Sequence, residues 1–210
     1  MNQNLTDVTV LLDRSGSMDA CRIEAENGVN HFIEDQKNAA GTVNLTLAQF
    51  DNVFEYLVTC KPIHEVQKFH LVPRGMTALL DAVGKLIDDT GVRLASMKEE
   101  NRPGLVVIAI VTDGQENASQ RFTKSQIKSM IERQTSQYKW QFTYLGANQD
   151  AFTEAQGLGI QANAVANYKA CKSDKTFEAL SNNVKRMRSS SVSGQSISCL
   201  YTDDERITMD

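Results

Sequence analysis

Three oxygen-bearing side chains follow the first apolar segment of the chain. Residues 8–12 read Val-Thr-Val-Leu-Leu and predict a buried strand, and Asp13, Ser15 and Ser17 come directly after it. One carboxylate and two hydroxyls therefore lie on the loop that leaves this strand. Such a group of oxygen ligands suits a hard cation.

Two further oxygens come from segments far along the chain. Thr77 precedes a helical run that starts at Ala78, and Asp113 ends an apolar strand over residues 105–112. Two carboxylates and three hydroxyls suit Mg²⁺ or Mn²⁺, because these ions prefer oxygen ligands and keep several waters when protein ligands are few. The set contains no sulfur ligand of the kind that soft metals prefer.

The pattern Asp-x-Ser-x-Ser, a later Thr and a Thr-Asp-Gly resembles the metal-ion-dependent adhesion site of von Willebrand factor A domains. All five motif positions are filled, and the resemblance covers roughly residues 5–188. It implies that Ser15, Ser17 and Thr77 contact the metal, with Asp13 and Asp113 acting directly or through water. In this family an acidic side chain from a partner completes the coordination sphere of the ion.

The balance of charge in this site predicts what it recognises. An ion held mostly by neutral hydroxyls keeps its positive character and an exchangeable water, so an incoming carboxylate can bind it. The resemblance thus implies an adaptor that binds an Asp or Glu of a protein partner through Mg²⁺. Taken singly, Asp13, Ser15 and Ser17 could instead be turn or helix-capping residues.

Length and composition predict an ordinary globular protein. The 210 residues fit one domain over residues 1–188 with a tail over 189–210. A net charge of −4 gives no reason to expect nucleic-acid binding, which normally needs a basic excess. The sequence has no apolar stretch of about 18 residues and no signal-peptide pattern at its start, so we expect no membrane partner and a cytoplasmic location.

Short apolar runs alternate with helical patterns, which predicts an α/β, doubly wound, Rossmann-like fold with helices on both faces of a mostly parallel sheet. Residues 105–111 are unbroken aliphatics and should form a central strand. Asp51-Asn52 separates two further runs and predicts a hairpin with an antiparallel edge strand. Strands are predicted over residues 8–12, 43–50, 53–62, 105–112, 140–145 and 162–168, and helices over about 20–38, 78–89, 127–134, 150–156 and 174–187.

Other polar residues have simpler interpretations. The cysteines and histidines lack the spacing of a zinc site, so we expect reduced structural thiols and ordinary histidines. The turn over residues 146–150 could cradle a phosphate, but Asn148 or Asp150 acting as a helix cap explains it equally well. The cysteines are Cys21, Cys60, Cys171 and Cys199, and the histidines are His31, His64 and His70. Lys185, Arg186 and Arg188 form a basic cluster, but the dipole at the end of a helix favours such cations without a ligand.

Two alternative functions use the same metal site. A self-assembling protein could use Asp203, Asp204 or Glu205 of one chain as the ligand for the next, because the Ser-rich residues 189–198 predict a flexible linker. The simpler expectation is that Leu200 and Ile207 pack the tail as an edge strand or that it is disordered.

A metal-dependent hydrolase is the third reading. It would need Glu116 or Asn117 as a base or supporting ligand, although a solvated loop is the simpler interpretation of this segment. The sequence contains no Ser-His-Asp order, Walker loop or HExxH run, so we do not expect an enzyme.

Overall fold

The computed structural model describes residues 1–147, 150–169 and 173–209. Its centre is a six-stranded sheet with the order β3-β2-β1-β4-β5-β6, in which β3 pairs antiparallel with β2 and the other neighbours pair in parallel. This confirms the predicted doubly wound sheet with one antiparallel edge strand. The strands are β1 (Asn2–Asp13), β2 (Thr42–Phe50), β3 (Phe54–Pro62), β4 (Pro103–Thr112), β5 (Gln141–Gly146) and β6 (Val165–Asn167).

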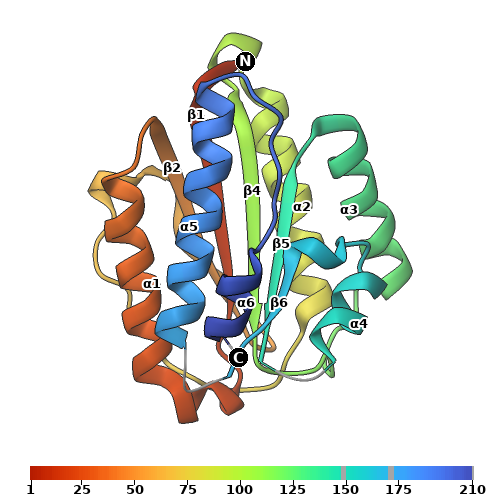
Figure 1. Ribbon diagram of the computed structural model, residues 1–210. Coiled ribbons are helices and arrows are strands. Elements are labelled where there is room, and N and C mark those ends of the chain that lie inside the picture. The colour runs from red at the N-terminus through yellow and green to blue at the C-terminus, as the bar shows by residue number, and fades with distance from the viewer. Residues whose placement is uncertain (148–149, 170–172, 210) are drawn as a thin grey trace.

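Helices cover both faces of the sheet. The two helices α1 and α5 lie side by side across one face, and α2 and α3 lie behind the sheet (Figure 1). None of the described helices is long and apolar enough to cross a membrane. The helices are α1 (Arg22–Lys37), α2 (Leu79–Ser96), α3 (Lys124–Tyr138), α4 (Ala151–Gly157), α5 (Ser173–Val192) and α6 (Asp203–Met209), with a 3-10 turn η1 (Gly16–Cys21) before α1.

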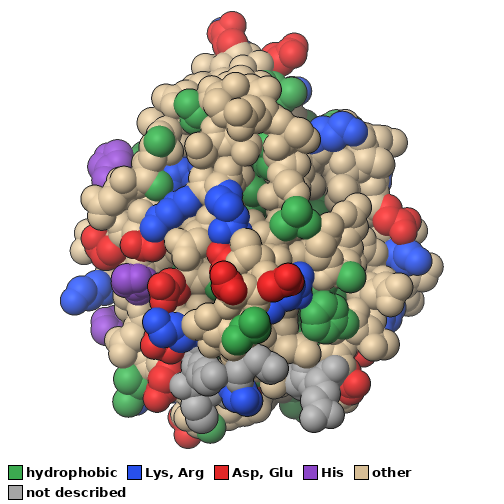
Figure 2. All heavy atoms as spheres, viewed as in Figure 1, with side chains coloured by type: hydrophobic (Ala, Val, Ile, Leu, Met, Phe, Trp, Pro, Cys, Tyr) green, Lys and Arg blue, Asp and Glu red, His purple; other side chains and the backbone are tan. Residues whose placement is uncertain are grey.

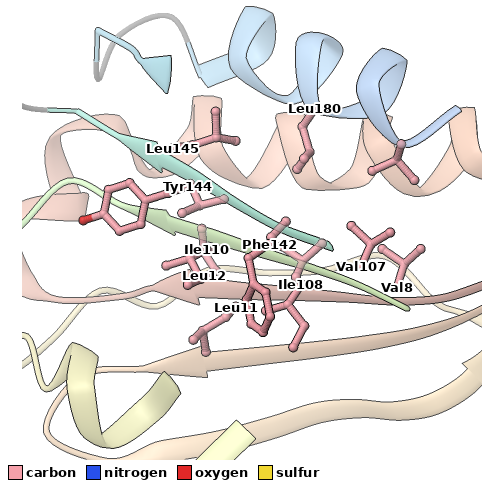
Figure 3. Packing of buried hydrophobic residues seen from close by; sticks show 14 of the residues in the cluster. Val8, Leu11, Leu12, Val107, Ile108, Ile110, Phe142, Tyr144, Leu145 and Leu180 are labelled. Carbon is pink, nitrogen blue, oxygen red and sulfur yellow. The ribbon is translucent and has the colours of Figure 1, made fainter. Parts of the chain in front are cut away.

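The hydrophobic core has one layer on each side of the sheet. Strand β4 lies between β1 and β5, and its aliphatic side chains are buried on both faces, as predicted. Leu145 of β5 and Leu180 of α5 extend into one layer, whereas Leu11 and Ile108 belong to the other (Figure 3). This two-sided burial makes the central strands a rigid support for the loops at their ends.

The end of α5 differs from the prediction. The helix continues to Val192, so it includes the first residues of the segment that composition predicts to be a linker. Arg188 and Ser191 are buried, and the Ser191 hydroxyl donates to the carbonyl of Gln3 at 3.2 Å. The serines are helical because contacts with residues distant in sequence stabilise them, which composition does not register. The last strand is also shorter than predicted, because residues 162–164 form a 3-10 turn.

The tail packs against the domain as a short helix rather than as an edge strand. Tyr201 is 5% exposed and Met209 is 0% exposed. The Tyr201 hydroxyl lies 2.7 Å from the hydroxyl of Thr143, and Glu205 forms an ion pair with Arg186. Acidic and basic side chains are interspersed over the face that carries α1, α5 and α6 (Figure 2).

Candidate metal centre

The ends of β1 and β4 lie side by side at the carboxyl edge of the sheet. These two parallel strands are neighbours. The chain adds β2 and β3 on the outer side of β1, and it adds β5 and β6 on the outer side of β4, so the direction of the strand order reverses between β1 and β4. Ligand sites in doubly wound folds occur at such a reversal. Asp13 is the last residue of β1 and Asp113 directly follows β4, so the topology brings both carboxylates to this edge.

Asp13 is buried and each of its carboxylate oxygens has its own donor. The residue is 0% exposed. Its Oδ1 accepts a hydrogen bond from the backbone N–H of Ser15 at 2.7 Å, and its Oδ2 accepts one from the hydroxyl of Thr112 at 2.6 Å. These bonds fix the orientation of the carboxylate without using all of its lone pairs.

Hydroxyl contacts connect the loop after β1 to Asp113. The Oγ atoms of Ser15 and Ser17 lie 3.0 Å apart, and Ser17 Oγ donates to Asp113 Oδ1 at 2.9 Å. Ser15 is buried, whereas Ser17 is exposed and Asp113 is half-buried. The cluster is therefore open to a ligand on the side of Ser17.

Thr77 reaches the same cluster from the segment before α2. A Cβ built on Gly114 would lie 2.8 Å from Thr77 Oγ1 and 3.5 Å from Asp13 Oδ2, so both oxygens are near one point. Thr77 is 2% exposed, and its hydroxyl has no hydrogen-bond partner within the described residues. The hydroxyl oxygen is thus available to another ligand, and Gly114 leaves the space beside it open.

Both carboxyl groups of the cluster have raised pKa values. Burial raises the pKa of Asp13, and the hydrogen bonds from Thr112 and Ser15 act in the opposite direction. Burial also raises the pKa of Asp113 to about 6; the bond from Ser17 opposes this increase and the charge of Asp13 adds to it. Two carboxylates placed close together with little solvent favour a cation between them.

This donor set fits a small divalent cation. Among the described residues, no three or more His, Cys, Asp or Glu side chains are grouped to hold a metal, so a soft-metal site is not indicated here. The available donors are instead two carboxylates and three hydroxyls, which suit Mg²⁺ or Mn²⁺. The structure brings together all five residues predicted from the sequence, and their role as metal ligands stays a prediction.

Two further residues hold the site: Thr112, which was not assigned such a role from the sequence, and Asn117, which was considered there only as a base or supporting ligand of a hydrolase. Thr112 binds Asp13, as described above. Asn117 forms a pair of hydrogen bonds with Thr77: its Oδ1 accepts from Thr77 N at 2.9 Å, and its own N donates to Thr77 O at 3.0 Å. The role of Thr112 could have been inferred from its place in the Thr-Asp-Gly triplet. The role of Asn117 could not, because its partner Thr77 lies 40 residues away in the sequence.

The segment after β4 is a partly exposed loop, as expected, but Glu116 within it is half-buried and holds backbone groups. Its Oε2 accepts a hydrogen bond from the N–H of Leu80 at 2.9 Å, and its Oε1 accepts one from the N–H of Ala118 at 2.9 Å and one from that of Ser119 at 2.7 Å. Leu80 lies in the first turn of α2, where N–H groups lack partners within the helix. Glu116 therefore connects the loop after β4 to the helix that follows Thr77.

The basic cluster near the end of α5 has three separate structural partners. Lys185 pairs with Asp35 at 2.7 Å, and Arg186 pairs with Glu205 at 2.6 Å. Arg188 is buried and donates to the backbone carbonyl of residue 36 in the last turn of α1 and to those of residues 39, 40 and 41 that follow the helix. These contacts account for the cluster without a ligand.

The remaining candidates do not form a site in the described residues. His31, His64 and His70 are exposed. Cys60 and Cys199 are free thiols, and the buried Cys21 donates through its Sγ to the carbonyl of Met18 at 3.7 Å. Cys171 and Asn148, for which a structural thiol and a helix cap were expected, lie outside the described residues.

Solved structures with the same fold were found. Proximal thread matrix protein 1 from the mussel byssus is similar with a TM-score of 0.63 and 15% identity, over 86% of this chain and 46% of that chain. A second structure of that protein, at 17% identity, has a zinc-occupied MIDAS motif. A von Willebrand factor type A protein from Catenulispora acidiphila is similar with a TM-score of 0.60 and 12% identity, over 89% of this chain and 42% of that chain.

A third similar structure is the manganese-loaded TRAP protein of Plasmodium vivax, with a TM-score of 0.58 and 16% identity over 84% of this chain and 74% of that chain. No protein-family model and no curated protein matches the sequence. This chain spans less than half the length of the first structures compared. At these identities the likeness shows the fold, whereas the site rests on the residues described above.

Proposed function

We propose that this chain, which has the von Willebrand factor A fold, is an interaction module that binds an acidic side chain of a protein partner through Mg²⁺ or Mn²⁺. The observation that carries the proposal is the cluster of Asp13, Ser15, Ser17, Thr77 and Asp113 at the point where the strand order reverses. Similar structures include adhesion and matrix proteins, some with a divalent metal.

In this proposal the protein residues hold and orient the ion. The three hydroxyls of Ser15, Ser17 and Thr77 are neutral, so the two carboxylates would at most balance the charge of a divalent ion. When bound, the ion supplies a Lewis-acid position that a partner carboxylate can fill. The exposed side chain of Ser17 marks the open side of the cluster.

The contacts of Glu116 favour an interaction module over a hydrolase. A general base needs a carboxylate that can approach water at the metal. Each carboxylate oxygen of Glu116 instead accepts backbone N–H groups of its own loop or of α2. This carboxylate is therefore occupied in holding the loop.

Metal binding is tested by unfolding the protein in Mg²⁺, in Mn²⁺ and in chelator. A ligand that binds only the folded state stabilises it by about 2.7 kcal/mol at a hundredfold excess over Kd. Thr77→Val should lose most of this stabilisation while the metal-free variant stays folded, because the Thr77 hydroxyl has no partner in the described structure. Ser129→Ala is the control, since Ser129 is an exposed α3 residue whose hydroxyl donates to the carbonyl of Ser125 within the same helix.

Partner recognition is tested with Asp-containing and Asn-containing versions of one peptide. The Asp peptide should bind in Mg²⁺ and lose its affinity in chelator, and the Asn peptide should bind weakly in both. Equal affinity for the two peptides, or full metal stabilisation of Thr77→Val, would contradict the proposal.

A further inference from the structure

Arg74 lies beside the candidate metal centre and is fixed there by a buried carboxylate. Its Nε donates to Asp51 Oδ2 at 2.8 Å. The side chain of Arg74 is 59% exposed, whereas that of Asp51 is 3% exposed. Within the described residues neither Nη atom of Arg74 has a hydrogen-bond partner, so both remain available to a ligand.

Backbone hydrogen bonds attach Arg74 to the loop that carries the metal-site serines. The N–H of Arg74 donates to Arg14 O at 2.7 Å, and the N–H of Gly16 donates to Gly75 O at 3.1 Å. The segments 14–16 and 74–75 therefore run beside each other. Thr77 is three residues from Arg74, so the two Cα atoms are at most about 11 Å apart.

Two glycines keep the surface between Arg74 and the serines low. Gly16 and Gly75 are both exposed, and a Cβ on Gly16 would lie 3.6 Å from Gly75 O. Gly75 has a φ of +73°, and a Cβ there would lie 2.5 Å from Asn52 Oδ1. A side chain is excluded at Gly75, which leaves this strip open to the backbone of a partner.

A second arginine underlies the same surface. Arg14 is 4% exposed, and its Nε donates to Asp51 Oδ2 at 3.1 Å. Its Nη1 donates to Glu55 at 2.7 Å, and its buried Nη2 has no partner in the described structure. Asp51 therefore faces two cations, and the second anion, Glu55, is 48% exposed and partly screened by solvent. The two arginines and the two carboxylates balance in charge, so what the surface offers a further anion is the pair of Nη atoms of the exposed Arg74, which have no hydrogen-bond partner in the described structure.

We propose that Arg74 binds a second carboxylate of the partner, while the first carboxylate completes the metal centre. This inference rests on the proposed function and narrows the partner to a segment with two acidic side chains. A guanidinium binds a carboxylate through two parallel hydrogen bonds, and the free Nη atoms of Arg74 provide such donors. Acidic residues three positions apart in a polyproline II segment lie on one side of it and about 9 Å apart, which is within the upper limit of about 11 Å between the Cα atoms of Arg74 and Thr77.

The experiment compares two synthetic peptides of Gly and Ser. One carries an Asp and, three residues later, a Glu; the other has Gln in place of that Glu. In Mg²⁺ the wild-type protein should bind the diacidic peptide about fivefold more tightly, as expected for one exposed charge pair. Arg74→Gln should bind both peptides equally with unchanged Mg²⁺ affinity, and the metal-free protein should stay folded but melt at a lower temperature, because the buried Asp51 loses an ion pair.

Arg133→Gln is the control, because it removes the same charge from an exposed position on α3. It should keep the fivefold preference. If the wild-type protein binds both peptides equally but only in Mg²⁺, the contact with Arg74 is wrong and metal-dependent recognition stands. If neither peptide shows Mg²⁺-dependent binding, the proposed function itself is wrong.

Discussion

The hydroxyl of Thr112 donates to Asp13 Oδ2 at 2.6 Å and so joins the ends of the two central strands. Thr112 ends β4 and Asp13 ends β1, and both side chains are 0% exposed. A buried carboxylate needs such a donor to stay ionised. Through this bond, Thr112 on β4 orients the carboxylate of Asp13, a candidate metal ligand on β1.

Thr112→Val should weaken metal binding by about 10- to 100-fold, as expected when a residue that orients a ligand is lost. It should also lower the free energy of unfolding by about 2 kcal/mol, because Asp13 loses a hydrogen bond in a buried site. Mn²⁺ titration and urea unfolding measure the two effects. Thr9→Val is the matched control on β1: the Thr9 hydroxyl is buried without a partner in the described structure, so its removal should be neutral or stabilising.

Gly114→Ala should abolish metal binding and lower the free energy of unfolding of the metal-free protein by about 1–3 kcal/mol, because the buried Thr77 must shift. The added Cβ would lie 2.8 Å from Thr77 Oγ1 and would fill the space between that oxygen and Asp13. Mn²⁺ titration should show no saturable binding, while urea unfolding of the metal-free variant still shows one cooperative transition. Gly91→Ala is the control, since a Cβ at this position in α2 meets no atom within 4 Å. It should bind metal normally and gain about 0.5–1 kcal/mol. Normal Mn²⁺ affinity in Gly114→Ala would place the metal elsewhere.

Asp51→Asn should lower the free energy of unfolding by about 3 kcal/mol at pH 7, because it leaves Arg14 buried beside a neutral group. Burial alone would raise the pKa of Asp51, but the hydrogen bonds from Arg74 and Val53 and the charges of both arginines lower it below 3.8. A lowered folded-state pKa gives stability that is present above the unfolded pKa and is lost as the pH falls through the folded value.

The difference between wild type and Asp51→Asn should therefore be constant from pH 7 to pH 5 and shrink below about pH 3.8. Urea unfolding across this range provides the measurement. Glu34→Gln, which removes an exposed pair with Lys37, should cost less than about 0.5 kcal/mol at pH 7. A pH-independent difference for Asp51→Asn would show that its charge does not stabilise the fold.

The sequence predicted the elements and residues that local signals specify. Unbroken aliphatics at residues 105–111 identified the central strand, and Asp51-Asn52 identified the hairpin. Asp13, Ser15 and Ser17 form a short motif directly after an apolar run, so these residues could be proposed as a cluster from the sequence, and their role as metal ligands stays a prediction. The alternation of strands and helices predicted a mostly parallel sheet, and in such a sheet the loop that carries these three residues lies at the same edge as Asp113.

Residues held by distant partners could not be predicted in the same way. Arg14 is buried because Asp51 lies beside it, and these residues are 37 positions apart. Asp81 accepts the N–H groups of residues 120–122 and so fastens the loop after β4 to α2. Neither contact has a local pattern, since both depend on how the finished sheet brings loops together. The helical serines of α5 were missed for the same reason.

Arg188→Met should destabilise the fold by about 3 kcal/mol, although the cation has no carboxylate partner in the described structure. Its guanidinium occupies the carbonyl end of α1, where helix carbonyls lack partners. Burial lowers the pKa of Arg188 to about 10, so it stays charged at pH 7. Arg186→Met should cost about 1 kcal/mol or less, because its pair with Glu205 is partly exposed. Equal costs in urea unfolding would refute the capping role.

Removing the tail tests whether it is structural or a metal ligand for a second copy. Deletion of residues 199–210 should destabilise the protein, because it removes the buried side chains of Tyr201 and Met209. The milder change Tyr201→Phe should cost about 1 kcal/mol through its lost contact with Thr143. Urea unfolding gives both values, and neither variant should change the Mg²⁺ affinity.

The assembly alternative gives a different result. It requires Asp203 or Asp204, which are exposed, to reach the metal centre of another chain, since Glu205 is already paired with Arg186. A double change of these aspartates to Asn keeps the helix and its buried residues. If sedimentation shows a Mg²⁺-dependent oligomer that this double variant loses, the tail is an intermolecular ligand. If the wild type and the double variant are both monomers, in Mg²⁺ and in chelator, the assembly alternative is wrong and the tail has the structural role that its packing supports.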